Sequence, residues 1–487
     1  MTEALTGAAA RNYIGGEWRE PASGETYEKR SPWRPDVVTG VFPASDAEDA
    51  RTAIETASAA FPAWSALPAP ERAAFFTRAA AALEARVERV AQDMTAEMGK
   101  PLREARLETL RAVTILRYAA GEAFRSVGEV YASSVPNQRL YTLRRPLGVV
   151  GLITPWNFPL AIPVWKLAPA LIHGNTVVLK LAYDAPRTGL HIAACFAEAG
   201  LPAGVLNVIS GSGSTAGAEI VSNPGVHAIS FTGSVPVGQH VRDAATARGC
   251  RVQLELGGHN PLIVASDAEL DRAVEAAYAG AFWSAGQKCT ATRRILVQRD
   301  VYDDFRERLR VRIAAGKVGD PADPETEVGP VVNERALEEI LGAIERARND
   351  GGTLLVGGER IDTEGYLLPP TVFEGLTDDA ELSCEEVFGP VTSLYRFSTI
   401  DEAIERANAV RFGLSAAIFT RDLHTIQRFT GSIGAGVVHV NSQTVGADVH
   451  APFGGLKSSG WGPPEQGRAA IEFYTETVTV YQDAPLG

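Results

Sequence analysis

The sequence predicts an α/β protein with a parallel sheet, and its length, its short apolar runs and the segments between them support this prediction. A chain of 487 residues exceeds the size at which a single hydrophobic core stops growing, about 250–300 residues, so two or more domains are expected. Short apolar runs lie at residues 147–153, 175–179, 205–209 and 228–231. Such runs are typical of strands buried on both faces of a parallel sheet, and the segments between them are long enough for helices.

Three stretches carry helix signals. Residues 45–61 begin with Ser45 and Glu48 at capping-box spacing, after which apolar side chains recur on one face. A second helix is expected at about 103–124. A third is expected at 186–199, because glycine and proline follow it.

The composition narrows the possible function classes. The net charge is −13, and contacts to phosphates need a clustered basic surface, so nucleic-acid binding is a poor hypothesis. No run approaches the roughly 18 uninterrupted apolar residues of a membrane span. The N-terminus has an acidic residue, Glu3, and no apolar signal block. We therefore expect a cytoplasmic protein with neither a nucleic acid nor a membrane as partner.

The chain has four cysteines, Cys195, Cys250, Cys289 and Cys384. Four in a chain of this length do not make a disulfide framework, and they lack the close pairing of a zinc site, so no metal is expected. Any single cysteine is more often a buried apolar residue than a nucleophile. The case for a reactive thiol therefore depends on its neighbours.

Two turns between a strand and a helix suit a bound phosphate, although the usual G-x-G-x-x-G is absent. One is the glycine-rich stretch at 211–217, which includes Gly213, and the other contains Gly233 and Ser234. Helix N-termini present free N–H groups and the positive end of the helix dipole. Lys180, at a strand end, adds a cation. Each signal alone is also compatible with an ordinary turn or a solvated lysine.

Five short motifs occur together in one order along the chain. They are TPWNFP (154–159), ELGG (255–258), GQKCT (286–290), EVFGP (386–390) and PFGGLK (452–457). In these motifs, and over nearly its whole length, the chain resembles the NAD(P)-dependent aldehyde dehydrogenase superfamily. One tetrapeptide is weak evidence, but five in the family's order are specific.

The resemblance implies three residues at the chemical centre. Aldehyde oxidation needs a nucleophile that adds to the carbonyl, and Cys289 matches the family's catalytic cysteine. The side-chain amide of Asn157 and the backbone N–H of Cys289 match its oxyanion hole. Glu255 matches the base that hydrolyses the thioester, which distinguishes hydrolytic from CoA-acylating relatives. By residue type alone, Asn157 could be a turn residue and Glu255 a solvated acid.

The resemblance also implies a nicotinamide cofactor, NAD or NADP. Glu386 matches the residue that holds the nicotinamide ribose, and Phe388 lies beside the ring. At Tyr183 the commonest NAD-specific pattern has a glutamate that holds the adenine ribose. Tyr183 would not repel a 2′-phosphate, so we expect NADP to be accepted or preferred. The remaining matches to the family's cofactor contacts are Thr154, Trp156, Lys180, Gly233 and Ser234.

Two further positions are less clear. Lys166 matches a lysine close to the active site, and its role is left open. The family's C-terminal Gly-Arg-Glu pattern is altered here by an extra proline before Glu465. Glu465 is the candidate for the family's glutamate.

The substrate signals favour a carboxylate-bearing semialdehyde. Segments 287–292 and 465–470 most resemble the α-ketoglutaric semialdehyde (2,5-dioxopentanoate) dehydrogenase branch of the family. Arg111 falls at a tunnel-facing position that is usually apolar in the family, where it could bind a substrate carboxylate. It could equally be an exposed arginine paired with Glu108. Apolar walls would come from Trp165, Trp283 and Phe453.

Three alternatives are weighed against this reading. Within the family, the substrate could be an aromatic or apolar aldehyde. The chain could instead be a non-catalytic binding or structural protein with the same fold. A zinc-dependent alcohol dehydrogenase would need clustered cysteine and histidine ligands that are not visible.

The predicted organisation has three parts. A Rossmann-like nucleotide-binding domain spans 1–124 and 147–256, and an α/β catalytic domain spans 257–455. Strand-like segments at 141–145 and 478–481 are expected to pair in a β-arm, which together with the C-terminal segment comprises 125–146 and 456–487. The family resemblance implies that this arm joins subunits into a homodimer or homotetramer.

Overall fold

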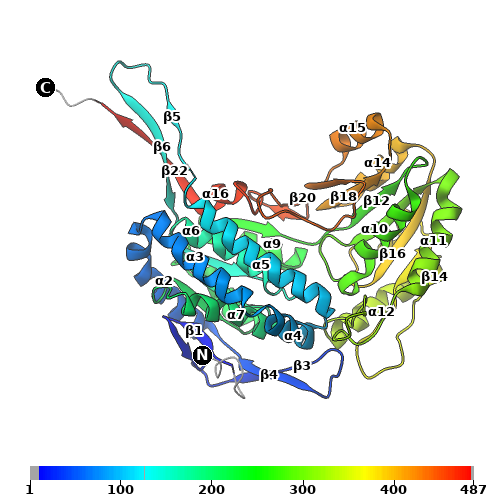
Figure 1. The fold of residues 1–487 in the computed structure, drawn as a ribbon, viewed down its shortest axis with the longest axis horizontal. Helices are drawn as coiled ribbons and strands as arrows, with labels where there is room; N and C mark the ends of the chain where they lie inside the picture. The colour runs from blue at the N-terminus through cyan, green and yellow to red at the C-terminus, as the bar shows by residue number, and fades with distance from the viewer. Residues whose placement is uncertain (1–9, 126, 484–487) are drawn as a thin grey trace.

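The computed structural model describes residues 10–125 and 127–483. It contains two α/β bodies and a β-arm that extends away from them (Figure 1). The parts of the predicted domains and arm at 1–9, 126 and 484–487 lie outside the described residues.

The first sheet has eight strands in the order β2-β1-β9-β8-β7-β10-β11-β21. Its central strands are parallel, and the strand order reverses between β7 and β10, which is where ligands bind in open α/β sheets. The four predicted apolar runs form four of these strands. The bounds are β7 (Val149–Ile153), β8 (Thr176–Lys180), β9 (Leu206–Ile209), β10 (Ala228–Thr232) and β11 (Arg251–Glu255), with β1 (Asn12–Ile14), β2 (Glu17–Arg19) and β21 (Gly460–Trp461) antiparallel at the edges.

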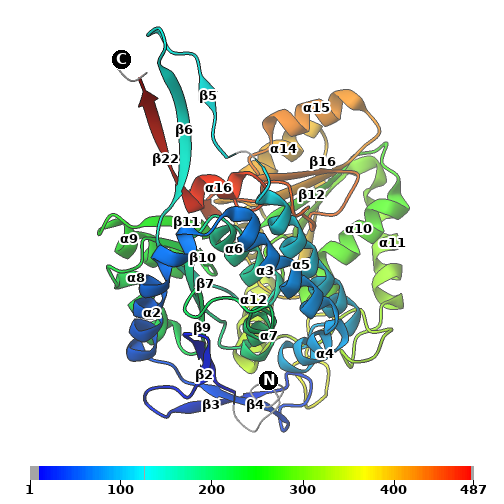
Figure 2. The ribbon, with the colours of Figure 1, turned by 60° about the vertical axis from the view of Figure 1, so that its left-hand side comes forward.

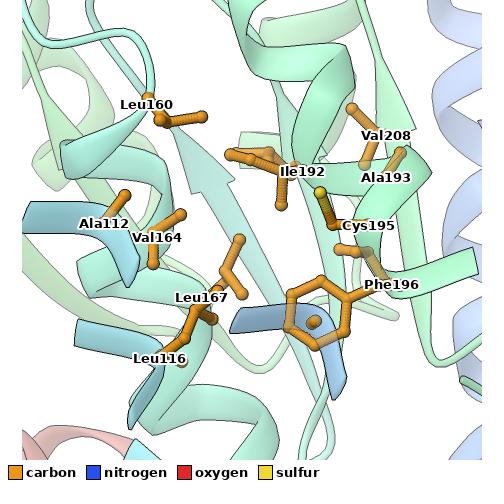
Figure 3. Packing of buried hydrophobic residues seen from close by; sticks show 14 of the residues in the cluster. Ala112, Leu116, Leu160, Val164, Leu167, Ile192, Ala193, Cys195, Phe196 and Val208 are labelled. Carbon is orange, nitrogen blue, oxygen red and sulfur yellow. The ribbon is translucent and has the colours of Figure 1, made fainter. Parts of the chain in front are cut away.

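Helices cover both faces of this sheet and fix its core. Side chains of α5 (Leu102–Glu122), α6 (Ala161–Ile172) and α7 (Pro186–Glu198) interlock, among them Leu116, Leu167 and Cys195 (Figure 3). Cys195 is therefore a core residue. The other helices here are α2 (Ala47–Ala66), α3 (Ala69–Glu84), α4 (Val87–Met98), α8 (Ala218–Ser222), α9 (Val235–Thr246) and α16 (Ala469–Tyr474), and a small hairpin pairs β3 (Thr26–Arg30) with β4 (Val38–Pro43).

The predicted capping box at Ser45 and Glu48 is wrong by one residue. Asp46 caps α2, accepting hydrogen bonds from the backbone of Glu48 and Asp49, and the Asp49 side chain completes the box. The Ser45 hydroxyl is instead used in a buried exchange of hydrogen bonds with Asn12.

The second sheet has seven strands in the order β14-β15-β16-β13-β12-β18-β19. Its core is separate from that of the first sheet. The strands are β12 (Asn260–Val264), β13 (Thr292–Gln298), β14 (Thr353–Val356), β15 (Thr371–Glu374), β16 (Val391–Phe397), β18 (Ser415–Phe419) and β19 (Val437–Val440). The helices are α10 (Leu270–Phe282), α11 (Tyr302–Ala315), α12 (Glu334–Asn349), α13 (Glu381–Cys384), α14 (Ile400–Asn408) and α15 (Leu423–Ser432), and β17 (Phe412–Gly413) pairs with β20 (Leu456–Lys457).

The arm pairs β6 (Arg139–Pro146) with β22 (Thr475–Gln482), and β5 (Val130–Tyr131) adds a short third strand. Figure 2 shows the three strands extending together beyond both bodies. The predicted pairing of 141–145 with 478–481 is confirmed, with Tyr141 opposite Val480. Residues from 456 onward do more than form the arm, because β21 extends the first sheet. Within the part of the chain that the structure describes, no helix is both long and apolar enough to cross a membrane.

Candidate active site

The candidate site lies where the chain passes from the first sheet to the second. Glu255 ends β11 and Asn260 begins β12, with two glycines between them. A Cβ on Gly257 would lie 2.0 Å from Glu386 Oε2, and one on Gly258 would lie 2.5 Å from the carbonyl oxygen of Cys289. The ELGG motif therefore lets Glu255, Glu386 and the Cys289 loop approach one another closely.

Cys289 lies at the end of a tightly held loop before β13. Ser284 and Ala285 adopt φ of 56° and 53°, a left-handed conformation that such residues rarely occupy. The buried guanidinium of Arg293 donates to the carbonyls of Gly286 and Gly389, both at 2.6 Å. The side-chain oxygen of Gln287 accepts from Val332 N at 2.9 Å. The loop is thus fixed by contacts from several segments of the second body.

The surroundings of Cys289 keep its thiol neutral in this state. Burial and the negative charges of Glu255 and Glu386 raise its pKa to about 12. Because a thiolate is the reactive form, attack on a substrate requires a base that removes the proton. Cys384 is also partly exposed, so exposure alone does not distinguish Cys289.

Glu255 is the candidate for this base, because its charge acts on the thiol. Its side chain is buried, and Oε2 has no hydrogen-bond partner among the described residues. Burial and the nearby charge of Glu465 raise the pKa of Glu255 well above its usual range, while Lys166 acts in the opposite direction. A carboxylate whose pKa is raised by burial is a stronger base than a solvated one.

Glu465 joins a buried polar network behind Glu255. Lys166 pairs with Glu465 Oε1, and Trp165 Nε1 donates to Oε2 at 2.6 Å. The Ser230 hydroxyl lies 3.0 Å from Glu465 Oε1 and 2.8 Å from Lys166 Nζ. Sequence reasoning left Lys166 without a role and placed Glu465 only doubtfully. Ser230 lies in the apolar run at 228–231, and nothing in that run indicated a polar network.

Asn157 points its amide at the Cys289 loop. Nδ2 donates to the carbonyl of Gln287 at 3.1 Å, which leaves the second amide hydrogen available. Its side chain is buried, and Oδ1 has no partner among the described residues. The Asn157 carbonyl accepts from Lys100 Nζ at 2.7 Å, a contact that the sequence did not suggest. The structure therefore brings Asn157, Cys289 and Glu255 to one place.

A cleft of about 420 Å³ adjoins this centre, which is within the size range of ligand-binding clefts. Trp156, Glu386 and Phe388 line it, and the rings of Trp156 and Phe388 meet edge to face at 5.6 Å. Burial raises the pKa of Glu386 to about 7, while the charge of Arg293 acts to lower it. Glu386 also accepts from Gly258 N at 3.1 Å, which leaves its other oxygen as an acceptor for a sugar hydroxyl.

The predicted phosphate-binding residues gather at the carboxyl edge of the first sheet. Thr154 N donates to the carbonyl of Lys180 at 3.3 Å. The helical turn Gly213–Gly217 lies beside the Lys180 side chain, and a Cβ on Gly213 would meet nothing within 4 Å. Gly233 N donates to the carbonyl of Glu255 at 3.1 Å, and Ser234 occupies the N-cap position of α9 without a side-chain capping hydrogen bond. Burial lowers the pKa of Lys180 to about 8.

Tyr183 lies at the rim of this region. Its ring stacks on Tyr27 with centroids 3.9 Å apart and planes 12° apart. The neighbouring carboxylate, Asp184, is engaged by Lys29 at 3.1 Å and Asn333 at 3.2 Å. The sequence did not reveal the Tyr27 partner, which is far from Tyr183 along the chain.

Three of the four predicted substrate-side residues, Arg111, Trp165 and Phe453, lie together, whereas Trp283 packs against Arg103 and Lys288. The Arg111 guanidinium lies 6.0 Å above the ring of Trp165, whose centroid is 5.6 Å from that of Phe453. Arg111 donates to the carbonyl of Ala447 and to Gln466 Oε1. The alternative pairing with Glu108 is wrong, because Glu108 is bound to Lys100.

The chain matches the model of the aldehyde dehydrogenase family over residues 18–480. An alpha-ketoglutaric semialdehyde dehydrogenase of Bacillus subtilis (strain 168) is 44% identical over 474 residues, covering 96% of this chain and 97% of that protein. A 2,5-dioxopentanoate dehydrogenase of Saccharolobus solfataricus is 43% identical over 465 residues, covering 94% and 97%. A solved structure of betaine aldehyde dehydrogenase from Staphylococcus aureus with NAD+ has a TM-score of 0.96 at 34% identity, covering 100% and 97%.

Proposed function

The chain belongs to the aldehyde dehydrogenase family and is an NAD(P)-dependent enzyme that oxidises an aldehyde to a carboxylate, and we propose that Cys289, Asn157 and Glu255 carry the reaction. One observation carries the proposal: the Asn157 amide contacts the Cys289 loop at 3.1 Å while the charge of Glu255 acts on the thiol. A nucleophile, an oxyanion donor and a base in one place are the parts that this chemistry needs.

The proposed sequence of steps begins with the thiol. Cys289 adds to the aldehyde carbon, and its proton passes to Glu255 and then to bulk water. The oxyanion that forms accepts hydrogen bonds from the free amide hydrogen of Asn157 and the backbone N–H of Cys289. A nicotinamide cofactor, held by Trp156, Glu386 and Phe388, would supply the acceptor for the hydride of this carbon. The resulting thioester on Cys289 is attacked by a water molecule that gives its proton to Glu255, which releases the carboxylate and restores the thiol.

For the cofactor, the residues Trp156, Glu386 and Phe388 fit the nicotinamide end, and Lys180 and Tyr183 the adenosine end. We propose that NADP is accepted, because Tyr183 carries no charge that would repel a 2′-phosphate and Asp184 is already paired with Lys29 and Asn333. Lys180 supplies a cation for a 2′-phosphate. A tenfold higher kcat/KM with NAD than with NADP, equivalent to about 1.4 kcal/mol, would contradict the cofactor proposal.

For the substrate, we propose a semialdehyde that bears a carboxylate, such as α-ketoglutaric semialdehyde. Arg111 is the candidate anchor, because its guanidinium lies 6.0 Å from the ring of Trp165, which packs beside Phe453. The names of the relatives from Bacillus subtilis and Saccharolobus solfataricus agree with this class. An aromatic or apolar aldehyde is the second candidate, because Trp165 and Phe453 would also suit it.

One experiment tests this function: reduced cofactor formation is followed at 340 nm with a panel of aldehydes, each with NAD and NADP. We expect the carboxylate-bearing semialdehyde to give the highest kcat/KM, NADP to support turnover, and Cys289→Ala to abolish it. Cys384→Ala is the matched control, because Cys384 is also a partly exposed free thiol. Turnover by Cys289→Ala would contradict the assigned nucleophile, and preference for an apolar aldehyde would replace the substrate proposal.

We also propose that the enzyme is a cytoplasmic homodimer or homotetramer. The four free cysteines are compatible with a reducing compartment. The exposed edges of the arm offer strands for pairing with a second copy. Cell fractionation tests the compartment, with recovery outside the cytoplasm as the contradicting result.

A further inference from the structure

Helix α5 carries two glutamates one turn apart, Glu104 and Glu108, whose side chains reach the loops that hold Cys289 and Asn157. Residues at this spacing lie on one face of a helix. Their side chains are only 11% and 2% exposed. Neither belongs to the motifs or to the reacting centre described above.

Glu104 holds the loop that leads to Cys289. Its Oε1 accepts from Ser284 N at 2.9 Å, and its Oε2 accepts from the Ser284 hydroxyl and from Lys288 Nζ, both at 2.8 Å. Ser284 has a left-handed backbone, which persists only where its surroundings hold it. Lys288 directly precedes Cys289. Glu104 therefore fixes both ends of the turn that presents the thiol.

The charge state of Glu104 fits this contact. Burial acts to raise its pKa, but the charge of Lys288 and the hydrogen bonds from Lys288 and Ser284 outweigh it and hold the pKa below its usual range. Glu104 is therefore ionised at neutral pH, and its pairing with Lys288 means that neither of these two buried side chains carries an unpaired charge.

Glu108 holds the turn that carries Asn157. Its Oε1 accepts from the backbone N–H groups of Leu160 and Ala161 at 3.0 and 3.1 Å, which fixes the start of α6. Its Oε2 pairs with Lys100, and Lys100 Nζ donates to the Asn157 carbonyl at 2.7 Å. The peptide of Asn157 is thus tied to α5 through Lys100.

We propose that Glu104 and Glu108 are positioning residues, and that α5 acts as a spacer between the nucleophile loop and the oxyanion donor. The hydrogen bond from Asn157 Nδ2 to the Gln287 carbonyl closes the connection between the two loops. Small displacements of reacting groups are costly, so a fixed spacing favours catalysis. The proposal rests on the functions proposed for Cys289 and Asn157.

The test measures how fast Cys289 is acylated by p-nitrophenyl acetate, a reaction that needs the thiol and the oxyanion donor but no cofactor. In Glu104→Gln and Glu108→Gln we expect this rate and kcat to fall by on the order of 10²-fold, with little change in KM or cofactor Kd. Alkylation by iodoacetamide needs only the thiol. We expect it to be retained in Glu108→Gln and reduced in Glu104→Gln, a split that a general loss of structure would not produce.

The matched control is Glu88→Gln. It removes an exposed carboxylate of α4 that binds Arg106 of α5 at 2.7 Å. We expect it to acylate like the wild type. If Glu104→Gln fails to fold, the double variant Glu104→Gln with Lys288→Met can replace it, because it removes both charges of the pair. We expect the same loss of acylation rate in this double variant. Folded variants that acylate at the wild-type rate, or an equal loss in Glu88→Gln, would overturn the proposal. Acylation that survives in Cys289→Ala would instead refute the proposed nucleophile.

Discussion

Cys289 and Cys384 show how little a single residue type says about chemistry. Both are free and partly exposed. The sequence distinguished Cys289 by its motif and by Asn157 and Glu255, which stand in motifs of their own. The structure adds the physical reason: burial and the negative charges of Glu255 and Glu386 raise the pKa of this thiol, so a base must remove its proton.

Other residues at the site could not be predicted because their partners are distant in the chain. Lys166 and Glu465 are separated by 299 positions, and Lys288 and Glu104 by 184. Each residue alone looks like an ordinary solvated charge. Only the folded arrangement shows that they are buried and paired.

Arg111 provides the prediction at the scale of a single residue. Replacing it with methionine keeps the apolar stem but removes the guanidinium. We expect kcat/KM for the carboxylate-bearing semialdehyde to fall by about 10- to 150-fold, the equivalent of about 1.5–3 kcal/mol for a hydrogen bond to a charged group. An uncharged aldehyde of similar length should be affected little.

The control for this prediction is Arg117→Met, since Arg117 lies on the same helix but pairs with Glu84 at the surface. Steady-state kinetics on both aldehydes gives the comparison. Equal losses on the two substrates would show that Arg111 maintains structure and does not recognise the carboxylate.

At the scale of elements, the apolar strands were predictable and β11 was not. β7 to β10 read as largely apolar runs because both faces of the sheet are covered. β11 contains two buried polar residues, Gln253 and Glu255. Gln253 donates a hydrogen bond to the carbonyl of Pro463, and Glu255 is the proposed base. A functional strand thus departs from the apolar pattern at the positions that matter. Helix α5 was predicted within a few residues, but the role of its glutamates depends on what lies opposite them.

The arm provides the prediction at this scale. Val130 and Tyr131 are 87% and 45% exposed on an edge strand, and Tyr481 is 66% exposed on the opposite edge. Unpaired edges of this kind invite pairing with another chain. We expect sedimentation velocity to show that the wild-type protein is a dimer or tetramer. The double variant Val130→Asp with Tyr131→Asp should shift the sedimenting species toward the monomer at unchanged Tm. Val311→Asp, at an exposed apolar residue of α11, is the control and should stay assembled. A wild-type monomer would contradict the proposed assembly.

On the scale of the whole molecule, the site depends on two separately packed sheets. β11 of the first sheet supplies Glu255, and the loop before β13 of the second supplies Cys289. The α/β class and the pairing of the arm follow from the sequence pattern. The convergence of the two sheets does not, because it depends on close contacts such as those of Gly257 and Gly258. The proposed domain boundaries remain predictions.

The most direct measurement of the central claim uses Glu255→Gln, mixed with cofactor and the carboxylate-bearing semialdehyde and examined by intact-protein mass spectrometry. Loss of the carboxylate removes a base but also removes one of the charges that raise the pKa of Cys289, so the thiol should still add to the aldehyde, although more slowly. Hydrolysis should slow by about 10²- to 10⁴-fold, so on extended incubation one equivalent of reduced cofactor should form and the enzyme should gain the mass of the acyl group. The double variant with Cys289→Ala should gain none. Wild-type turnover by Glu255→Gln, or an adduct that persists without Cys289, would contradict the account.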